Sequence, residues 1–184
     1  MENNNFGHLM VDIETMGSDS YSAIVSIGAV EFNLDTGETG DEFHKHICLQ
    51  SCLDNGLHVT KSTLYWWLQQ NEEARMKLIK SKQDDLEIAL VEFSEFVREH
   101  GGKDLQVWGN SARFDLGLLS DAYSVIKLPI PWYFRKERCI RTLVNFKPEI
   151  KINTPKVGIE HDALDDCYFQ IKYCTEIWKH LNKK

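Results

Sequence analysis

The chain has 184 residues, of which 42% are hydrophobic and 27% are charged, and its formal net charge is −7. This length and composition are typical of a single soluble globular domain, which we place at residues 1–184. No apolar run approaches the roughly 20 residues that span a bilayer, and the polar start, Met1–Gly7, lacks the features of a signal peptide. We therefore expect a cytoplasmic protein with no membrane partner.

The first third of the chain carries the patterns of β-strands. Leu9–Glu14 and Ala23–Phe32 are apolar runs of strand type, and the turn-rich segment Gly17–Ser20 separates them. The turn residues of Asp35–Gly37 then predict a hairpin that leads to a third strand near Glu42–Cys48. The chain is therefore expected to begin with three strands in an antiparallel meander.

Helical patterns dominate the remainder. Ser62–Ile79 is rich in helix-forming residues, and Asp84–His100 carries a continuous apolar stripe that stops at two glycines. Leu105–Trp108 is a short predicted strand, Asp115–Ile126 is a predicted helix, and a last helix runs from about Ala163 to Leu181. Strands followed by helices that alternate with a further strand predict a mixed α/β sheet with helices packed on it.

Cysteine usage and charge distribution narrow the class of protein. The five cysteines are an odd number without a C-x-x-C pair, which argues against a disulfide framework or a cysteine zinc site and favours reduced thiols.

A negative net charge is unusual for a protein that handles nucleic acid, but the segment from Arg135 to Lys156 holds seven basic and only two acidic residues. This basic segment is either a surface that attracts nucleic acid or a solvated loop, and the sequence leaves both interpretations open.

Asp12 and Glu14 form the first motif with chemical content. They end an otherwise apolar strand, and because strand side chains alternate, both carboxylates point to one face while Val11 and Ile13 point to the other. Neighbouring carboxylates repel each other, and a hard divalent cation such as Mg²⁺ or Mn²⁺ relieves the repulsion. A pair of this kind is also common where a strand simply ends in solvent.

Asp115 belongs to a second motif, at the point where a predicted strand gives way to a helix. Gly109, Asn110 and Ser111 form a turn of small residues before it, and strand ends are common positions for sites in α/β proteins. The alternative for Asp115 is a structural role as an acidic cap of the helix.

His161 and Asp166 form the third motif. Positions five apart do not share a helix face, so His161 is expected in the loop that enters the last helix while Asp166 projects from its first turns. The histidine would then approach a substrate that Asp166 holds. The alternative is a loop histidine in solvent, with the aspartates as favourable charges at a helix N-terminus.

Together these motifs resemble those of the DnaQ-like 3′→5′ exonucleases, within the ribonuclease H-like superfamily. The resemblance is to the subgroup with four acidic residues and a histidine (DEDDh). Its three motifs match Asp12 with Glu14, Asn110 with Phe114 and Asp115, and His161 with Asp166.

Features outside these motifs resemble a bacterial and phage branch of the family. They are the segments Thr63–Gln70, Trp108–Asn110, Arg138–Thr142 and His161–Asp166. Many relatives have an Asp-Thr pair where this chain has Arg141 followed by threonine, a departure that bears on subfamily and substrate rather than on chemistry. The resemblance to this branch implies that the protein is located in the cytoplasm of a bacterium, or in the cytoplasm of the host cell if the chain is phage-encoded.

The resemblance implies a ribonuclease H-like fold, in which a mixed five-stranded sheet is flanked by helices. It also implies two divalent ions, Mg²⁺ or Mn²⁺, and hydrolysis of the last phosphodiester with release of a nucleoside 5′-monophosphate. As a hypothesis, Asp12, Glu14 and Asp166 hold the ion that carries the attacking water, and Asp115 supports the second ion. His161 would accept the proton of that water.

Candidate substrate contacts surround these residues in the sequence. Thr15, Met16 and Gly17 follow the metal-binding strand, and their backbone N–H groups are candidates for binding the terminal sugar and phosphate. Asn110 and Ser111 are candidate polar contacts near the scissile bond.

Trp66 and Trp67 are adjacent on a predicted helix and therefore cannot share a face. We expect one in the core and take Trp66 as the candidate for stacking on a base. Core packing of both tryptophans is the competing interpretation.

The expected substrate is the 3′ end of single-stranded DNA or RNA. No motif reports on the 2′-hydroxyl that separates the two polymers, and the sequence leaves open whether the chain acts alone or as a homodimer. Two other readings rank lower: a ribonuclease H-like endonuclease, and a nuclease-derived nucleic-acid-binding module without catalysis.

Overall fold

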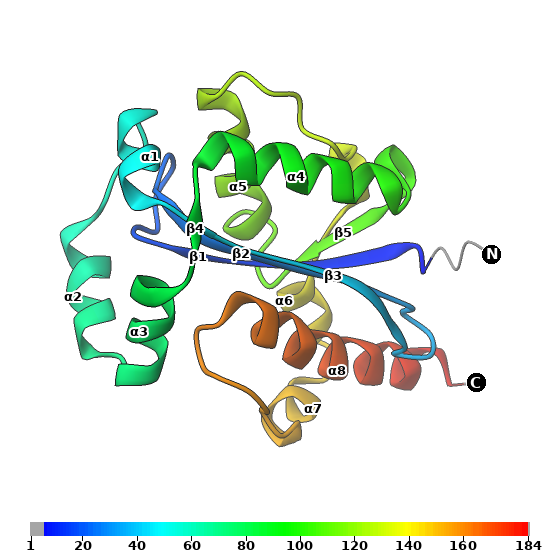
Figure 1. Cartoon of the computed structure of the whole chain (residues 1–184). Coiled ribbons are helices and arrows are strands. Elements are labelled where there is room, and N and C mark those ends of the chain that lie inside the picture. Colours follow the sequence, from blue (N-terminus) through cyan, green and yellow to red (C-terminus); the bar gives the residue numbers. More distant parts are fainter. Residues whose placement is uncertain (1–5, 184) are drawn as a thin grey trace.

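A single six-stranded mixed sheet organises the protein, as the computed structural model in Figure 1 shows for residues 6–183, the part of the chain that is described. The strand order is β4-β3-β2-β1-β5-β6. β1 pairs antiparallel with β2, and β2 with β3, whereas the β1–β5, β5–β6 and β3–β4 pairs are parallel. The strands are β1 (His8–Thr15), β2 (Ile24–Phe32), β3 (Thr39–Ile47), β4 (Gln83–Asp84), β5 (Gln106–Gly109) and β6 (Glu137–Cys139).

The predicted mixed sheet is confirmed, together with its opening antiparallel meander. The resemblance implied five strands, and the sixth is the two-residue edge strand β4. So short a strand has no hydrophobic alternation to reveal it in a sequence.

Helices cover both faces of the sheet. In Figure 1, α4 and α5 lie on one face, α6, α7 and α8 lie on the other, and α2 and α3 stand beyond one end of the sheet. The helices are α1 (Leu49–Asp54), α2 (Lys61–Gln69), α3 (Glu72–Lys80), α4 (Leu86–Glu99), α5 (Asp115–Val125), α6 (Ile140–Val144), α7 (Pro148–Asn153) and α8 (Ala163–Asn182).

The segment predicted as one helix over Ser62–Ile79 is two helices, α2 and α3. The break comes at Gln70 and Asn71, where the Asn71 side chain accepts a hydrogen bond from the backbone N–H of Ala74 at 2.8 Å. An asparagine that caps a helix in this way starts a new one, because it satisfies a backbone donor that the first turn leaves free.

The alternation of β1 divides the core into two layers. Leu9, Val11 and Ile13 pack in the layer that contains α4 and α5, whereas Met10 packs in the layer with α8. Asp12 and Glu14 continue the alternation of Met10, so they face α8. The sheet thereby presents both carboxylates to the side where the last helix begins.

Gly28 explains how α8 comes so close to the strand that carries these carboxylates. It lies on β2 directly opposite Asp12, and a Cβ atom there would stand 2.4 Å from the backbone carbonyl carbon of Ala163, the first residue of α8. Only glycine leaves room for a helix start at this distance from a strand.

No helix within residues 6–183 is both long and apolar enough to cross a bilayer. The first five residues of the polar segment Met1–Gly7, on which the expectation of no signal peptide rests, lie outside the described residues.

Candidate active site

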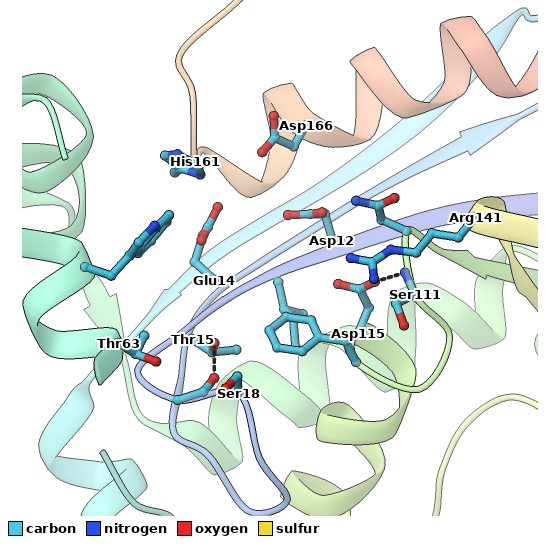
Figure 2. Close-up of a pocket in the computed structure, with 15 residues that line it drawn as sticks. Asp12, Glu14, Thr15, Ser18, Thr63, Ser111, Asp115, Arg141, His161 and Asp166 are labelled. Carbon is cyan, nitrogen blue, oxygen red and sulfur yellow. Dashed lines mark hydrogen bonds between the residues drawn. The ribbon is translucent and has the colours of Figure 1, made fainter. Parts of the chain in front are cut away.

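The three acidic motifs line one open cavity of about 370 Å³. Figure 2 shows Asp12, Glu14, Asp166 and His161 pointing into a common space, with Asp115 below them. The carboxylates come from β1, from the start of α5 and from the first turns of α8. Segments more than 100 residues apart in the chain thus contribute to one acidic cavity.

Burial makes this arrangement electrostatically costly for the protein alone. Asp12, Glu14 and Asp115 are each at least nine-tenths buried. Burial, then the neighbouring charges of Asp115, Glu14 and Asp166, raises the pKa of Asp12 well above its usual range. Burial and neighbouring carboxylates likewise raise the pKa of Glu14 to about 8, and burial raises that of Asp115 to about 7. A cation in the cavity would remove this cost.

Asp115 is fixed by the turn that precedes it. Its Oδ2 accepts a hydrogen bond from the backbone N–H of Ser111 at 2.8 Å. A Cβ atom on Gly109 would lie 2.9 Å from the same oxygen, so a side chain at that position would displace the carboxylate. The small-residue turn therefore brings Asp115 onto the end of β5.

His161 is held in a strained backbone conformation with a φ of 62°. Its ring lies edge-on to the rings of Trp66, at 4.7 Å between centroids, and Trp67, at 6.1 Å. Strained non-glycine residues are found at functional sites when the surroundings hold them in place.

The next residue fixes the loop that carries His161. The Asp162 side chain caps α8 by accepting from the backbone N–H of Asp165 at 3.1 Å, and it also forms an ion pair with Lys77 of α3. The pair of helices α2 and α3, which carries the tryptophans, is thereby tied to the loop that carries the histidine.

The donor set suits a divalent metal ion. One ligand atom from each of Glu14, His161 and Asp166 lies within 4.8 Å of the others, and Asp12 and Asp115 line the same cavity. Lys156 approaches the cluster with its Nζ 2.7 Å from Oδ1 of Asp166. Arg141 lines the same cavity, and two cationic side chains do not balance four carboxylates, so the cavity retains negative charge for a cation.

Gln170 is a partner of the cluster that sequence reasoning missed. It lies on α8 one turn after Asp166 and is 3% exposed. Its Nε2 donates to Oδ1 of Asp12 at 2.6 Å, which fixes the orientation of that carboxylate. A buried polar residue at a core position of α8 was the available signal, because buried glutamine usually has a specific partner.

Residues 7–178 match the model of the 3′-5′ exoribonuclease Rv2179c-like domain. The chain belongs to this Rv2179c-like family. The predicted 3′→5′ exonuclease class is thereby confirmed.

The chain is also similar to a curated relative and, in fold, to solved structures. An exodeoxyribonuclease of Enterobacteria phage T4 is 28% identical over 190 residues, which cover 86% of this chain and 83% of the relative. The nuclease domain of 3′hExo, a DEDDh family member solved with rAMP, has a TM-score of 0.68 at 13% identity. The similar region covers 94% of this chain and 92% of the 3′hExo chain.

A third similarity shows the same fold within a larger protein. E. coli exonuclease I in complex with a dA16 oligonucleotide has a TM-score of 0.60 at 15% identity over 89% of this chain, which spans only 39% of that protein. The fold of the Rv2179c-like chain is therefore the ribonuclease H-like exonuclease fold that its sequence predicts.

Of the three residues predicted to bind substrate through backbone N–H groups, Met16 is misplaced. Its N–H donates to the carbonyl of Ala23 at 2.8 Å, and its side chain lines a separate apolar groove. Thr15 and Gly17 do line the acidic cavity. The partner of the Met16 N–H was not visible in the sequence, because this hydrogen bond closes a loop over the six residues 17–22.

Gly17 also shapes the loop in which it lies. A Cβ atom there would lie 2.3 Å from Oγ of Ser22, so glycine is required for the fold of the loop itself. Thr15 donates from Oγ1 to the carbonyl of Gly17 at 2.6 Å, which closes the same turn.

The two tryptophans divide as predicted. Trp67 is buried and its Nε1 donates to the carbonyl of Thr15 at 2.9 Å, whereas Trp66 is 40% exposed and lines the cavity. Asn110 and Ser111 also line it, and Oδ1 of Asn110 is buried with no hydrogen-bond partner among the described residues.

Arg141 faces the acidic cavity from α6, on the side of Asp12 and Asp115 (Figure 2). Within residues 6–183 its guanidinium forms no ion pair or hydrogen bond. Lys151 and Lys156 lie nearby. Burial, followed by the positive charges of Arg141 and Lys156, lowers the pKa of Lys151. We call these three residues the basic wall. All three belong to the basic segment between Arg135 and Lys156 that the sequence analysis singled out, and Arg141 was noted there as a departure from the family pattern.

Proposed function

We propose that this Rv2179c-like protein is a metal-dependent exonuclease that removes nucleoside 5′-monophosphates from the 3′ end of a single strand. The observation that carries the proposal is the convergence of four carboxylates and His161 in one open cavity. The domain is taken as residues 1–184, since the family match extends over residues 7–178.

The metal ligands in this proposal are Asp12, Glu14, Asp115 and Asp166. Bound Mg²⁺ or Mn²⁺ ions supply charge stabilisation to the attacking and leaving oxygens of the phosphodiester. Asp12 is buried among the other carboxylates, and Gln170 holds its Oδ1 in one orientation. Supporting side chains of this kind commonly tune metal affinity.

His161 is assigned as the general base. Its ring projects into the cavity beside Glu14 and Asp166, where it would accept a proton from the water that attacks the terminal phosphorus. The bond to the 3′ oxygen of the preceding nucleotide then breaks, and that oxygen takes up a proton.

The two ends of the cavity support one direction for the strand. Thr63 lies at one end and Arg141 at the other, with carboxylates between them (Figure 2), and Trp66 follows Thr63 by about one turn of α2. The terminal base would stack on Trp66, and the backbone phosphate on the 5′ side of the scissile bond would meet the basic wall. A cavity of about 370 Å³ is near the lower limit of ligand pockets, which suits one nucleotide.

Either polymer remains a candidate substrate. The family is described as exoribonuclease and the phage T4 relative as exodeoxyribonuclease, and the two similar structures hold rAMP and a dA16 oligonucleotide. The placement of the chain in a bacterial or phage branch is part of the same proposal and is supported by the T4 relative.

The test uses 5′-labelled single-stranded DNA and RNA of the same sequence, with Mn²⁺ or EDTA. We expect a ladder that shortens from the 3′ end, requires metal and is absent with Asp115→Asn; the faster polymer identifies the substrate. Binding without degradation would favour the non-catalytic module, and internal cleavage of a 3′-blocked strand would favour the endonuclease.

A further inference from the structure

A second group of metal-binding side chains lies away from the acidic cavity, and we call it the distal cluster. It consists of Glu31 at the end of β2, Asp41 of β3 and His100 at the C-terminal cap of α4. One ligand atom from each lies within 4.8 Å of the other two. Glu31 continues the alternation of Ile27 and Ala29, which face α4, so the cluster is on the opposite face of the sheet from Asp12.

Glu31 is a member whose carboxylate the fold satisfies only in part, through a hydrogen bond from the backbone of Asp41. It is 3% exposed, its Oε2 lies 3.6 Å from Nε2 of His100, and its Oε1 has no hydrogen-bond partner among the described residues. Burial raises the pKa of this carboxyl. A carboxylate directed at a histidine from inside the protein, with an oxygen unused, calls for a further cation or donor.

The backbone around Glu31 is shaped to bring two carboxylates together. The pairing of β2 with β3 shifts between Val30 and Phe32, so that Gly40 and Asp41 both lie opposite Glu31 in a β-bulge. Bulges re-aim side chains. A Cβ atom at Gly40 would stand 2.8 Å from Oε2 of Glu31, so a side chain there would fill the space beside the carboxylate.

His100 has the orientation of a metal ligand. Its Nδ1 lies 2.7 Å from the carbonyl oxygen of Phe96 and is therefore the protonated donor nitrogen. Nε2 faces the carboxylates, 3.2 Å from Oδ2 of Asp41 and 3.6 Å from Oε2 of Glu31. A backbone carbonyl on the second ring nitrogen is the usual support of a metal-binding imidazole.

The spacing of the donor atoms fits zinc. Zn–N and Zn–O bonds of about 2.0–2.2 Å in a tetrahedron place neighbouring ligand atoms about 3.3–3.5 Å apart, and the two distances from Nε2 lie on either side of that range. One imidazole with two carboxylates is also a set that suits Zn²⁺ better than Mg²⁺, which prefers oxygen alone.

We propose that Glu31, Asp41 and His100 bind one Zn²⁺ ion, with water in the fourth position, and thereby fasten the end of α4 to the bulge of the β2–β3 hairpin. The Asp41 side chain is 81% exposed, so the ion enters from solvent at this ligand. The site is independent of the exonuclease reaction and needs no substrate.

The test measures Zn²⁺ bound to full-length Asp12→Asn/Asp166→Asn protein, in which the acidic cavity has lost two ligands. Equilibrium dialysis with metal analysis should find about one Zn²⁺ per chain. Adding His100→Gln or Asp41→Asn should weaken binding at least tenfold. The matched control is His58→Gln, because His58 pairs with a single carboxylate, Asp19, at 3.1 Å, and binding should stay within twofold.

A folding defect is separated from loss of a ligand by the exposed residue. Asp41→Asn changes no buried group, so its thermal unfolding without metal should match that of the parent while the rise in Tm with Zn²⁺ disappears. Co²⁺ in place of Zn²⁺ should give visible tetrahedral bands that vanish with the same variants. Equal Zn²⁺ binding by the parent and the His100→Gln protein, or none by the parent, would overturn the proposal.

Discussion

At the scale of single residues, the roles of His161 and Asp12 can be separated by experiment. His161→Gln should lower kcat by about 10²–10⁴-fold, the usual contribution of a general base, and change Mn²⁺ affinity by less than about threefold. Asp12→Asn should lose both activity and Mn²⁺ binding. Isothermal titration calorimetry of Mn²⁺ binding, together with kcat measurements on the same variants, separates the two roles. Loss of metal from the His161 variant would show instead that the histidine is a ligand, which its place beside Glu14 and Asp166 permits.

Gln170 carries a second prediction at this scale. Its amide is the donor that orients Asp12 at 2.6 Å, so Gln170→Leu should weaken Mn²⁺ binding by about 10–100-fold, as removal of supporting hydrogen bonds does at metal sites. The measurement is the same titration, with thermal unfolding as the check on folding. The matched control is Gln83→Leu, since Gln83 is exposed and donates only to a backbone carbonyl of α3; unchanged metal affinity in Gln170→Leu would remove the assignment.

At the scale of elements, the close approach of α8 to β2 is the feature that assembles the site. Gly28→Ala places a Cβ atom 2.4 Å from the backbone of Ala163, so α8 must shift, and we expect destabilisation of about 1–3 kcal/mol together with reduced activity. Denaturant-induced unfolding measures the loss of stability. Gly117→Ala is the control: the nearest atom to the added Cβ is the carbonyl oxygen of Ala112, 3.9 Å away, and alanine in this helix should stabilise by about 0.5–1 kcal/mol. A neutral Gly28→Ala would show that the helix start is not packed as described.

The elements also show which features of the fold and of the site could be predicted from the sequence. Strand alternation placed Asp12 and Glu14 on one face, and loop position placed His161 before α8, because both follow from local geometry. The convergence of β1, α5 and α8 was available only through family resemblance, since nothing in the sequence around Gly28 shows that the backbone of Ala163 passes over it. Met16 was misassigned for the same reason: its N–H partner, Ala23, is set by tertiary structure.

The break between α2 and α3 and the role of Gln170 were missed for a different reason. Asn71 sits within a helix-rich stretch, and its capping hydrogen bond competes with a continuous helix by a small free energy that composition does not reveal. Gln170 lies between apolar positions of α8, where a pattern of hydrophobic residues carries no information on a polar partner 158 residues away.

At the scale of the whole molecule, the acidic cavity should couple stability to pH when metal is absent. Glu14 and Asp115 have pKa values of about 8 and about 7, against ordinary values of 4.5 and 3.8. The folded state therefore binds more protons than the unfolded state between about pH 4 and pH 8, and stability falls as the pH rises through this window. In EDTA, Tm should decline from pH 5 to pH 8, and Mn²⁺ should restore it.

The matched variant for this prediction is Asp12→Asn, which removes one charge from the cluster and keeps an oxygen for Gln170. In EDTA at pH 8 it should be more stable than the parent by about 1–3 kcal/mol, because one pKa unit corresponds to about 1.4 kcal/mol. At pH 5 the difference should shrink. An Asp12→Asn protein that is less stable at both pH values would mean that the carboxylates are satisfied without metal.

The charge distribution of the whole molecule yields a prediction about substrate binding. The net charge is −7, so attraction of a strand depends on the basic wall. Arg141→Gln should raise KM about tenfold or more and reduce the slope of log affinity against log salt by about 0.7, the value for one phosphate contact on a single strand. Lys82→Gln is the control, because Lys82 is 89% exposed at β4. Equal KM values for the two variants would exclude the wall as the phosphate site.

The most direct test of the central claim is the identity and order of the products. A single-stranded oligonucleotide that carries ³²P in its last internucleotide phosphate is incubated with the protein and Mn²⁺, and products are resolved over time. If the protein is a 3′→5′ exonuclease, the first labelled product is a nucleoside 5′-monophosphate, formed by the parent and by Lys82→Gln but not by Asp115→Asn. Labelled dinucleotides or longer fragments as first products, or equal release by Asp115→Asn, would contradict it.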